Sequence, residues 1–324
     1  MLPETRYAYS VARIRVAELN MLSKSRLERM LDSSRVSDAV RVLNEAGYPE
    51  NNDYEGILRE ETANLYSYLK EISPEPEIFD IFAYRYDSHN IKVLLKAELS
   101  GADYEGLMAD NGVIDKNTLG ILVRERNFGS FPQEFAEAIT KSLDTYARTK
   151  DPQIIDITVD GAYYRLYLRM AAATGSKFLV QLASKIIDIA NISAFIRVKS
   201  KMEDLDLLTR VLISGGTIKI KAYLESFSRE IEGFSDVLKG TGYSGLLDIL
   251  TESSGSITEF EKACDNYIMK FVRKFRHKAF GIEPLIGYML GKETDIKNAR
   301  IILVGKINRI SNDVIRERLR NGYV

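Results

Sequence analysis

A short motif occurs three times in this chain of 324 residues and constrains its fold more than any other feature. In each copy an Asp stands three residues before an Asn, and the residues one, three, four and five places after the Asn are apolar. The copies are Asp87–Asn90, Asp188–Asn191 and Asp295–Asn298. Their Asp positions are 101 and 107 residues apart (188 − 87 and 295 − 188). This spacing predicts one helical unit that occurs three times.

The shared apolar frame supports the repeat more strongly than the bare Asp and Asn do. With 20 Asp and 15 Asn in the chain, random placement gives about one such pair (20 × 15 / 324). An aromatic-rich amphipathic segment also precedes each copy, at 65–69, 163–168 and 267–271. A period of about 100 residues is too long for a tetratricopeptide, ankyrin or armadillo array. It indicates a triplicated subdomain of several helices, with boundaries that we place at 1–130, 131–228 and 229–324.

The Asp and Asn of each copy share one helix face. Asn90 interrupts an apolar stripe that runs from Phe79 to Ala97, and a buried amide must be hydrogen-bonded. Either each pair satisfies polar groups of its own fold, or it contacts a ligand or partner. We favour the structural alternative, because a catalytic pair is rarely needed three times in one chain. We expect each pair to hold its long helix against the neighbouring helix of its own unit.

Helical periodicity runs through most of the chain and predicts an all-α fold. Alternation typical of a strand occurs only at 155–159. Long helices are expected at 54–72, 152–174, 178–202 and 257–277, with Ser37 as the N-cap of a shorter one and Ser256 paired with Glu259 in a capping box. No apolar run approaches 18 residues, so no membrane-spanning segment is expected. The single cysteine, Cys264, excludes an internal disulfide and fits a reducing compartment.

Charge is unevenly distributed along the chain. Residues 1–162 carry a net charge of −9 (19 − 28) and residues 163–324 one of +8 (26 − 18). Such asymmetry fits a protein with more than one charged partner surface, or simply two differently solvated halves. The densest basic run interleaves cations with apolar residues and is either a partner contact or a solvated helix face. Its cations are Lys270, Arg273, Lys274, Arg276 and Lys278.

Signs of catalysis are sparse. Two histidines and one cysteine are too few for a zinc or nucleophile cluster. The stretch Gly287–Thr294 has one residue too few between its glycines for a phosphate loop, and no strand precedes it. Asp156 and Asp160 share a helix face, but no partner acid or metal ligand is evident, so we interpret them as solvent-facing or interface charges. We therefore predict no catalytic, cofactor-binding or metal-binding residue.

Five stretches carry a resemblance to a known family. They are Tyr7–Arg15, Leu22–Ser23, Leu31–Ser33, Leu43–Tyr48 and Tyr86–Lys92. In order and spacing they resemble the C subunit of the archaeal and bacterial A-type (V-type) ATP synthase, whose eukaryotic counterpart is the d subunit of the vacuolar ATPase. The resemblance extends over essentially the whole chain.

This resemblance implies an all-helical, funnel-like body of three similar subdomains around a pseudo-three-fold axis. Such proteins have no active site and need no cofactor. They form a socket on the membrane-embedded proteolipid ring, receive the rotor shaft made of the D and F subunits, and rotate with both. The resemblance thus implies a peripheral protein at the cytoplasmic face of the membrane, monomeric when isolated and present once per complex. It specifies neither the coupling ion nor the direction of operation.

Two other classes of function remain open at this point. A free-standing helical scaffold could bind acidic proteins or RNA through the basic C-terminal half, although a net charge of −1 argues against nucleic acid as the main partner. An enzyme could instead use Asp156, Asp160 and the three Asp–Asn pairs.

Overall fold

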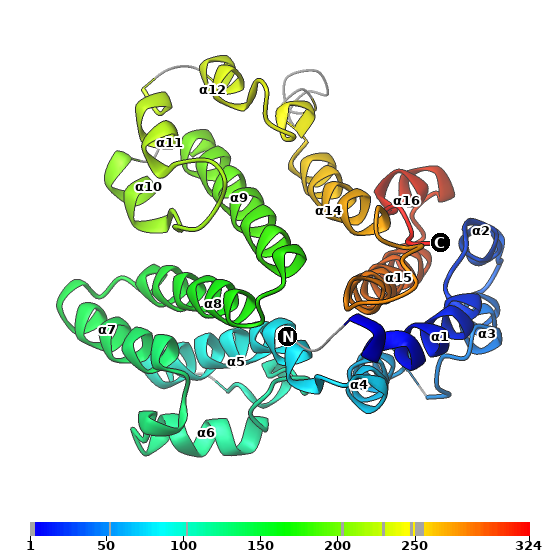
Figure 1. Ribbon diagram of the computed structural model, residues 1–324. Coiled ribbons are helices and arrows are strands. Elements are labelled where there is room, and N and C mark those ends of the chain that lie inside the picture. Colours follow the sequence, from blue (N-terminus) through cyan, green and yellow to red (C-terminus); the bar gives the residue numbers. More distant parts are fainter. Residues whose placement is uncertain are drawn as a thin grey trace. The chain divides into compact units, whose positions relative to one another are not determined.

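The protein is helical throughout the part of the chain that the structure describes. The computed structural model describes residues 4–51, 53–101, 103–201, 204–228, 231–246, 249 and 256–324. Every regular element in these ranges is an α-helix or a 3₁₀-helix, and no strand occurs in them. Figure 1 shows these helices coloured along the sequence. The predicted all-α class is confirmed.

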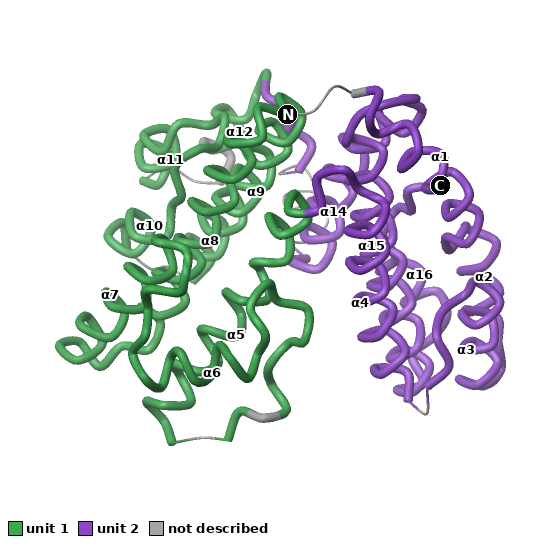
Figure 2. Tube along the Cα trace, turned by 60° about the horizontal axis from the view of Figure 1, so that its bottom comes forward, with its two compact units in different colours: residues 1, 77–240 green, residues 2–76, 241–324 purple. Residues whose placement is uncertain are grey.

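The helices form two compact units, which Figure 2 colours green and purple. Unit 1 comprises residue 1 and residues 77–240, and unit 2 combines residues 2–76 with 241–324. Unit 2 is therefore assembled from both ends of the chain. The three predicted subdomains and their pseudo-three-fold arrangement stay predictions.

Unit 1 is built around three long helices: α5 (Asp80–Ser100), α8 (Gln153–Ala173) and α9 (Lys177–Ser200). Helix α8 packs against both α5 and α9, and α7 (Gln133–Thr149) lies along α8. The remaining elements of this unit are short. They are η3 (Pro76–Phe79, starting one residue before the unit), η4 (Glu105–Leu107), α6 (Lys116–Arg124), η5 (Phe128–Ser130), α10 (Leu205–Val211), α11 (Ile220–Ser226) and α12 (Ile231–Leu238).

Helix α9 is long and apolar enough to cross a membrane by length and composition alone, with a mean hydropathy of 1.5 over its best window. Half of that window is buried inside the protein. The helix also carries Asp188 and Asn191 with no exposed side-chain surface. Packed against α8 and α10, α9 has the character of a core helix. Its polar residues interrupt the apolar sequence, so a search for unbroken apolar runs does not single it out.

Unit 2 is centred on α15 (Glu283–Ile307), the helix of the third copy. Helices α4 (Tyr54–Ile72), α14 (Ile257–Arg273) and α1 (Ala8–Ala17) contact it. The shorter elements of the unit are η1 (Glu4–Tyr7), η2 (Glu18–Asn20), α2 (Lys24–Asp32), α3 (Val36–Glu45) and α16 (Asn312–Arg318).

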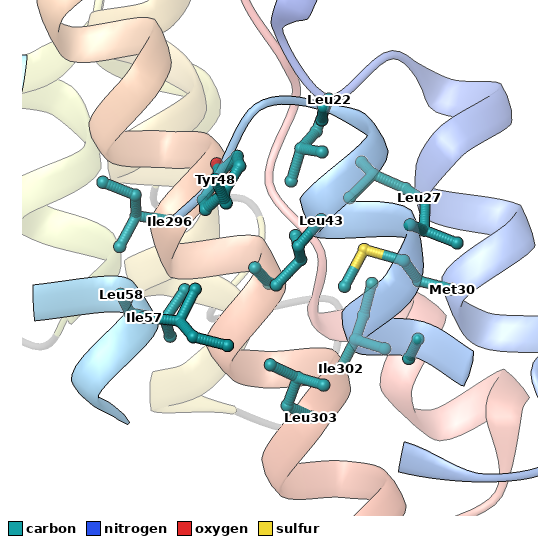
Figure 3. Close-up of a cluster of buried hydrophobic side chains, with 14 of the residues drawn as sticks. Leu22, Leu27, Met30, Leu43, Tyr48, Ile57, Leu58, Ile296, Ile302 and Leu303 are labelled. Carbon is teal, nitrogen blue, oxygen red and sulfur yellow. The ribbon is translucent and has the colours of Figure 1, made fainter. Parts of the chain in front are cut away.

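The core of unit 2 joins side chains from the two ends of the chain. Figure 3 shows Ile296, Ile302 and Leu303 of α15 among apolar side chains of the N-terminal segment, including Leu43 and Ile57. All five side chains are at most 5% exposed. Burying an aliphatic side chain of this size contributes about 1.5–3 kcal/mol, so this shared core holds the two segments together.

Side-chain caps mark the start of α2, α4, α6, α9, α10 and α14. Ser256 caps α14 by accepting a hydrogen bond from the amide of Glu259, as its capping-box spacing predicts. Ser37 does not cap α3, and that prediction is wrong. The helix begins at Val36, and the carbonyl of the preceding extended residue, Arg35, accepts the first helical hydrogen bonds. Helix α14 ends at Arg273, four residues before the expected end, and continues as turns.

Candidate functional site

The three repeated Asn side chains make the same pair of hydrogen bonds. The Asn90 amide donates to the carbonyl of Ala109 (2.9 Å) and accepts from the amide of the same residue (2.7 Å). Asn191 pairs in the same way with Ile213, at 2.8 Å for both bonds. Asn298 pairs with Arg320, at 3.0 and 2.8 Å.

Each Asn is therefore fully buried and clamps the backbone of a residue 19 or 22 positions further along the chain. Because both the donor and the acceptor of the side-chain amide are used, the amide is satisfied by the chain itself.

The Asp of the first two copies binds two consecutive backbone amides. Asp87 accepts from Val113 (2.7 Å) and Ile114 (2.9 Å). Asp188 accepts from the amides of Thr217 (2.9 Å) and Ile218 (3.0 Å), and also from the Thr217 hydroxyl. Hydrogen bonds from several N–H groups favour the charged form of a carboxylate.

A glycine stands immediately before these donors in both copies. A Cβ on Gly112 would lie 2.7 Å from the Asp87 carboxylate, and one on Gly216 would lie closer still to that of Asp188. Only a residue without a side chain lets the backbone approach the carboxylate this closely. The Asn-Gly and Gly-Gly dipeptides after the first two copies are thus part of the repeated device.

The third Asp is satisfied differently. Asp295 accepts one backbone hydrogen bond, from the amide of Leu22 (2.8 Å), and its Oδ1 has no partner among the described residues. Leu22 belongs to the N-terminal segment, between η2 and α2, whereas the donors to Asp87 and Asp188 follow their Asp by 26–30 residues. The third copy is completed by a segment from the other end of the chain.

Burial changes the acidity of two of these carboxyls. Desolvation raises the pKa of Asp87 to about 6, against the opposing effect of the Ile114 and Val113 amides. Desolvation raises the pKa of Asp295 to about 7, opposed by the Leu22 amide and by Lys292. Asp295 receives fewer hydrogen bonds than Asp87, which is consistent with its higher pKa.

The partners of the pairs differ from those that we expected. The clamped groups belong to connecting segments, at 109–114 between η4 and α6 and at 213–218 between α10 and α11. In the third copy they lie at Leu22 and directly after α16, at Arg320. The expectation of a neighbouring helix was wrong because Asp and Asn side chains are best matched by the free N–H and C=O groups that irregular segments present.

A buried ion pair near Asp295 was not among the features that we predicted from the sequence. The Lys292 ammonium lies 2.8 Å from the Glu61 carboxylate, and both side chains are at most 10% exposed. The ammonium also lies 4.0 Å from the ring centre of Tyr48. Lys292 stands one helical turn before Asp295, so its position on the buried face of α15 could have been read from the repeat.

The basic run divides into two parts. Lys270, Arg273 and Lys274 are exposed. Arg276 donates to the carbonyl of Tyr323 (3.4 Å), and Lys278 lies 2.6 Å from the Glu283 carboxylate. The last two cations therefore serve internal contacts, and only the first three are available to a partner.

The carboxylates of Asp156 and Asp160 form ion pairs with lysines of the first copy. Lys96 lies 2.7 Å from Asp156, and Lys92 lies 2.6 Å from Asp160. The two pairs connect α8 to α5 within unit 1, and all four side chains are partly exposed. The structure thus supplies partners that the sequence did not reveal.

Neither a phosphate loop nor a metal cluster is found in the described ranges. The stretch Gly287–Thr294 lies inside α15, where Tyr323 packs so closely on Gly287 and Gly291 that a Cβ at either would collide with it. No group of three or more His, Cys, Asp or Glu side chains in the described part of the chain could hold a metal ion.

The described fold defines an all-helical protein whose buried Asp–Asn pairs fasten irregular segments to its long helices. The family model described as the ATP synthase (C/AC39) subunit matches residues 10–318. The chain belongs to this family.

Named relatives are similar over nearly the full length. The C subunit of the V-type sodium ATPase of Enterococcus hirae is 28% identical, covering 96% of this chain and 97% of the relative. The C subunit of the A-type ATP synthase of Methanocaldococcus jannaschii is 27% identical, covering 97% and 86%. That of Methanothermobacter thermautotrophicus is 25% identical, covering 93% and 84%.

Proposed function

We propose that this protein is a non-catalytic rotor subunit of an A/V-type ATP synthase or ATPase. It forms a socket that joins the shaft of the D and F subunits to the membrane proteolipid ring. In this position it transmits the torque that couples ATP synthesis or hydrolysis to ion transport. The match of the family model over residues 10–318 carries the proposal, together with relatives that are named as the C subunits of such complexes.

The proposed location follows from this role. The protein lies at the cytoplasmic face of the membrane as a peripheral subunit, present once per complex and monomeric when isolated. Its partners are proteins, and nucleic acid is not among them.

Close internal packing supports a mechanical role. A part that transmits torque must not deform, and close-packed protein interiors have low compressibility. The connecting segments at 109–114 and 213–218 are each held by three or more hydrogen bonds to a buried pair. Such clamps reduce the freedom of the segments to move against their helices.

We further propose that the chain comprises three similar subdomains, 1–130, 131–228 and 229–324, around a pseudo-three-fold axis. Three observations support it: each copy has a buried Asn clamped to backbone, each has an Asp bound to a backbone amide, and each pair lies in a long helix. In the third subdomain the Asp is bound by the N-terminal segment of the chain and not by a segment of the same subdomain.

The decisive experiment measures complex formation. Purified protein is mixed with a purified D–F complex from the same source and, separately, with proteolipid rings in detergent, and co-elution is followed by size-exclusion chromatography. The proposal expects one copy bound to each partner, and a ternary complex when all are mixed. A rotary complex reconstituted without the chain should hydrolyse ATP with little coupled ion transport.

Absence of binding to both the shaft and the ring would contradict the proposal. The free-standing scaffold would be favoured instead if the protein bound RNA with a steep salt dependence and had no affinity for the shaft. Binding of ATP by the isolated chain would argue against a non-catalytic role.

A further inference from the structure

A groove runs along α14 in unit 2, and two exposed cations of the basic run, Lys270 and Arg273, line it. It has a volume of about 670 Å³, which is within the range of protein ligand sites. One wall is α14, from Ala263 to Arg273, and the other includes Gly245 and Leu246. Asn321, near the C-terminus, also lines it.

The groove is elongated along the helix. Its lining residues on α14 include Ala263, Asn266, Lys270 and Arg273, a spacing that puts them on one helical face. Ten residues of α-helix span about 15 Å. An extended peptide of about four to five residues covers the same length. A free phosphate or carboxylate ion would fill only a small part of it.

The charge of the groove is positive and uncompensated among the described residues. Lys270 and Arg273 line it one helical turn apart, both are exposed, and none of the described lining residues is acidic. Neither cation forms an ion pair with any described residue. Two neighbouring cations with free guanidinium and ammonium donors favour an acidic ligand.

Other cations close to the groove are already paired. Arg320 lies 3.0 Å from the Asp265 carboxylate, which also binds Lys297. Lys278 is paired with Glu283. Unlike these three cations, Lys270 and Arg273, which face the groove, form no ion pair with any described residue.

A polar side chain, Asn266, lines the groove between its two ends. The Asn266 Oδ1 accepts from the amide of Asn321 (2.7 Å), which fixes the orientation of the side chain. Its Nδ2 then remains as a donor. A peptide offers a backbone carbonyl for such a donor about every 3.3–3.6 Å along its length, whereas a compact ion does not.

We propose that this groove is a docking site for an extended acidic peptide segment of a partner protein. Lys270 and Arg273 bind two of its carboxylates, and Asn266 binds its backbone. The inference does not depend on the assignment of the shaft or the ring as partners. A nucleic acid is disfavoured, because two cations neutralise few phosphates and phosphate contacts dominate nucleic-acid affinity.

The test uses the full-length protein and a fluorescein-labelled hexaglutamate peptide, with binding followed by fluorescence anisotropy. The expected result is that hexaglutamate binds about tenfold more tightly than hexaglutamine. The variant Lys270→Gln/Arg273→Gln should lose about tenfold in affinity, since each partly exposed ion pair contributes a few-fold. Both side chains are exposed, so the melting temperature should not change.

The matched control is Lys24→Gln/Lys274→Gln, which removes the same charge from two exposed lysines that do not line the groove. It should change the affinity by less than about twofold. A second variant, Gly245→Glu, places a carboxylate inside the groove at a position where a Cβ meets no atom within 4 Å. It should weaken hexaglutamate binding without unfolding the protein.

Several results would overturn the proposal. They are equal losses in the test and control variants, tighter binding of an oligothymidylate of the same charge at the same salt concentration, and displacement of the peptide by inorganic phosphate at equal concentration. The last result would identify a site for a small oxyanion.

Discussion

Asn90 illustrates how much a single buried amide contributes to this fold. Replacing Asn90 with Leu removes both of its hydrogen bonds and leaves the amide and carbonyl of Ala109 without partners. The expected loss in the free energy of unfolding is about 2–3 kcal/mol, measured by urea denaturation. The variant should still bind the D–F shaft under conditions in which it is folded.

A control on the same helix is His89→Leu. This side chain is exposed and makes one hydrogen bond, to the carbonyl of Leu107, so the loss should not exceed about 1 kcal/mol. If Asn90→Leu left stability intact and abolished partner binding, the pairs would be ligand-contact residues.

The raised pKa of Asp295 predicts that stability depends on pH. Its pKa is about 7 in the folded protein and about 3.9 in an unfolded chain. Between these values the folded state binds more protons than the unfolded state, so the free energy of unfolding falls as the pH rises. From pH 6 to pH 8 this carboxyl should lower it on the order of 1 kcal/mol.

The measurement compares urea denaturation at pH 6 and pH 8 for the unaltered protein and Asp295→Asn. The Asn variant keeps an acceptor for the Leu22 amide and cannot ionise, so its stability should change less over this range. Equal pH dependence of the two proteins would show that Asp295 does not titrate there.

At the scale of elements, the first two copies each join a long helix to an irregular segment. A glycine in that segment lets its backbone approach the Asp carboxylate of the helix closely. Gly216→Ala and Gly112→Ala should both destabilise the protein, because their Cβ atoms would overlap the carboxylates of Asp188 and Asp87. We expect losses of about 1–3 kcal/mol, with the larger loss at Gly216, where the approach is closer.

Thermal or urea denaturation measures both losses. Gly106→Ala is the control, because a Cβ there meets no atom within 4 Å, and it should change the free energy of unfolding by less than about 0.5 kcal/mol. A loss at Gly216 no greater than that at Gly106 would mean that the segment can move away from its carboxylate at little cost.

The sequence predicted the long helices better than it predicted the groups that the Asp and Asn side chains of these helices bind. Periodicity located α4 at its observed bounds and placed α8 and α9 within a few residues. The burial of Asn90 was evident from the apolar stripe that it interrupts. The backbone groups at Ala109 and Leu22 could not be foreseen, because a backbone amide has no sequence signature and Leu22 lies 273 residues from Asp295.

We predict that the ion pairs between α5 and α8 contribute little to the free energy of unfolding. All four side chains are partly exposed, and exposed ion pairs each contribute about 0.2–1 kcal/mol. The double variant Asp156→Asn/Asp160→Asn should therefore lose at most about 2 kcal/mol, less at high salt, and should still support ATP-driven ion transport in a reconstituted complex. Loss of a chemical turnover by the isolated chain would instead favour the enzyme hypothesis.

At the scale of the whole molecule, the segments 2–76 and 241–324 share one unit although they lie far apart in the sequence. Residues 77–240 form most of unit 1, and a described hydrophobic cluster of that unit draws all its residues from this range. In unit 2, by contrast, the core of α15 is completed by α2, α3 and α4, and Asp295 is bound by Leu22. The two units should therefore respond differently when the chain is divided.

A fragment of residues 77–240 should fold alone, with helical circular dichroism and a cooperative thermal transition. A fragment of residues 241–324 should not, because α15 would expose Ile296, Ile302 and Leu303 to water, at a cost of about 1.5–3 kcal/mol for each side chain. Adding a fragment of residues 1–76 should restore a cooperative transition to the second fragment and leave the first unchanged. Cooperative folding of 241–324 alone would show that the third copy does not need the N-terminal segment, and failure of 77–240 to fold would show that unit 1 is not autonomous.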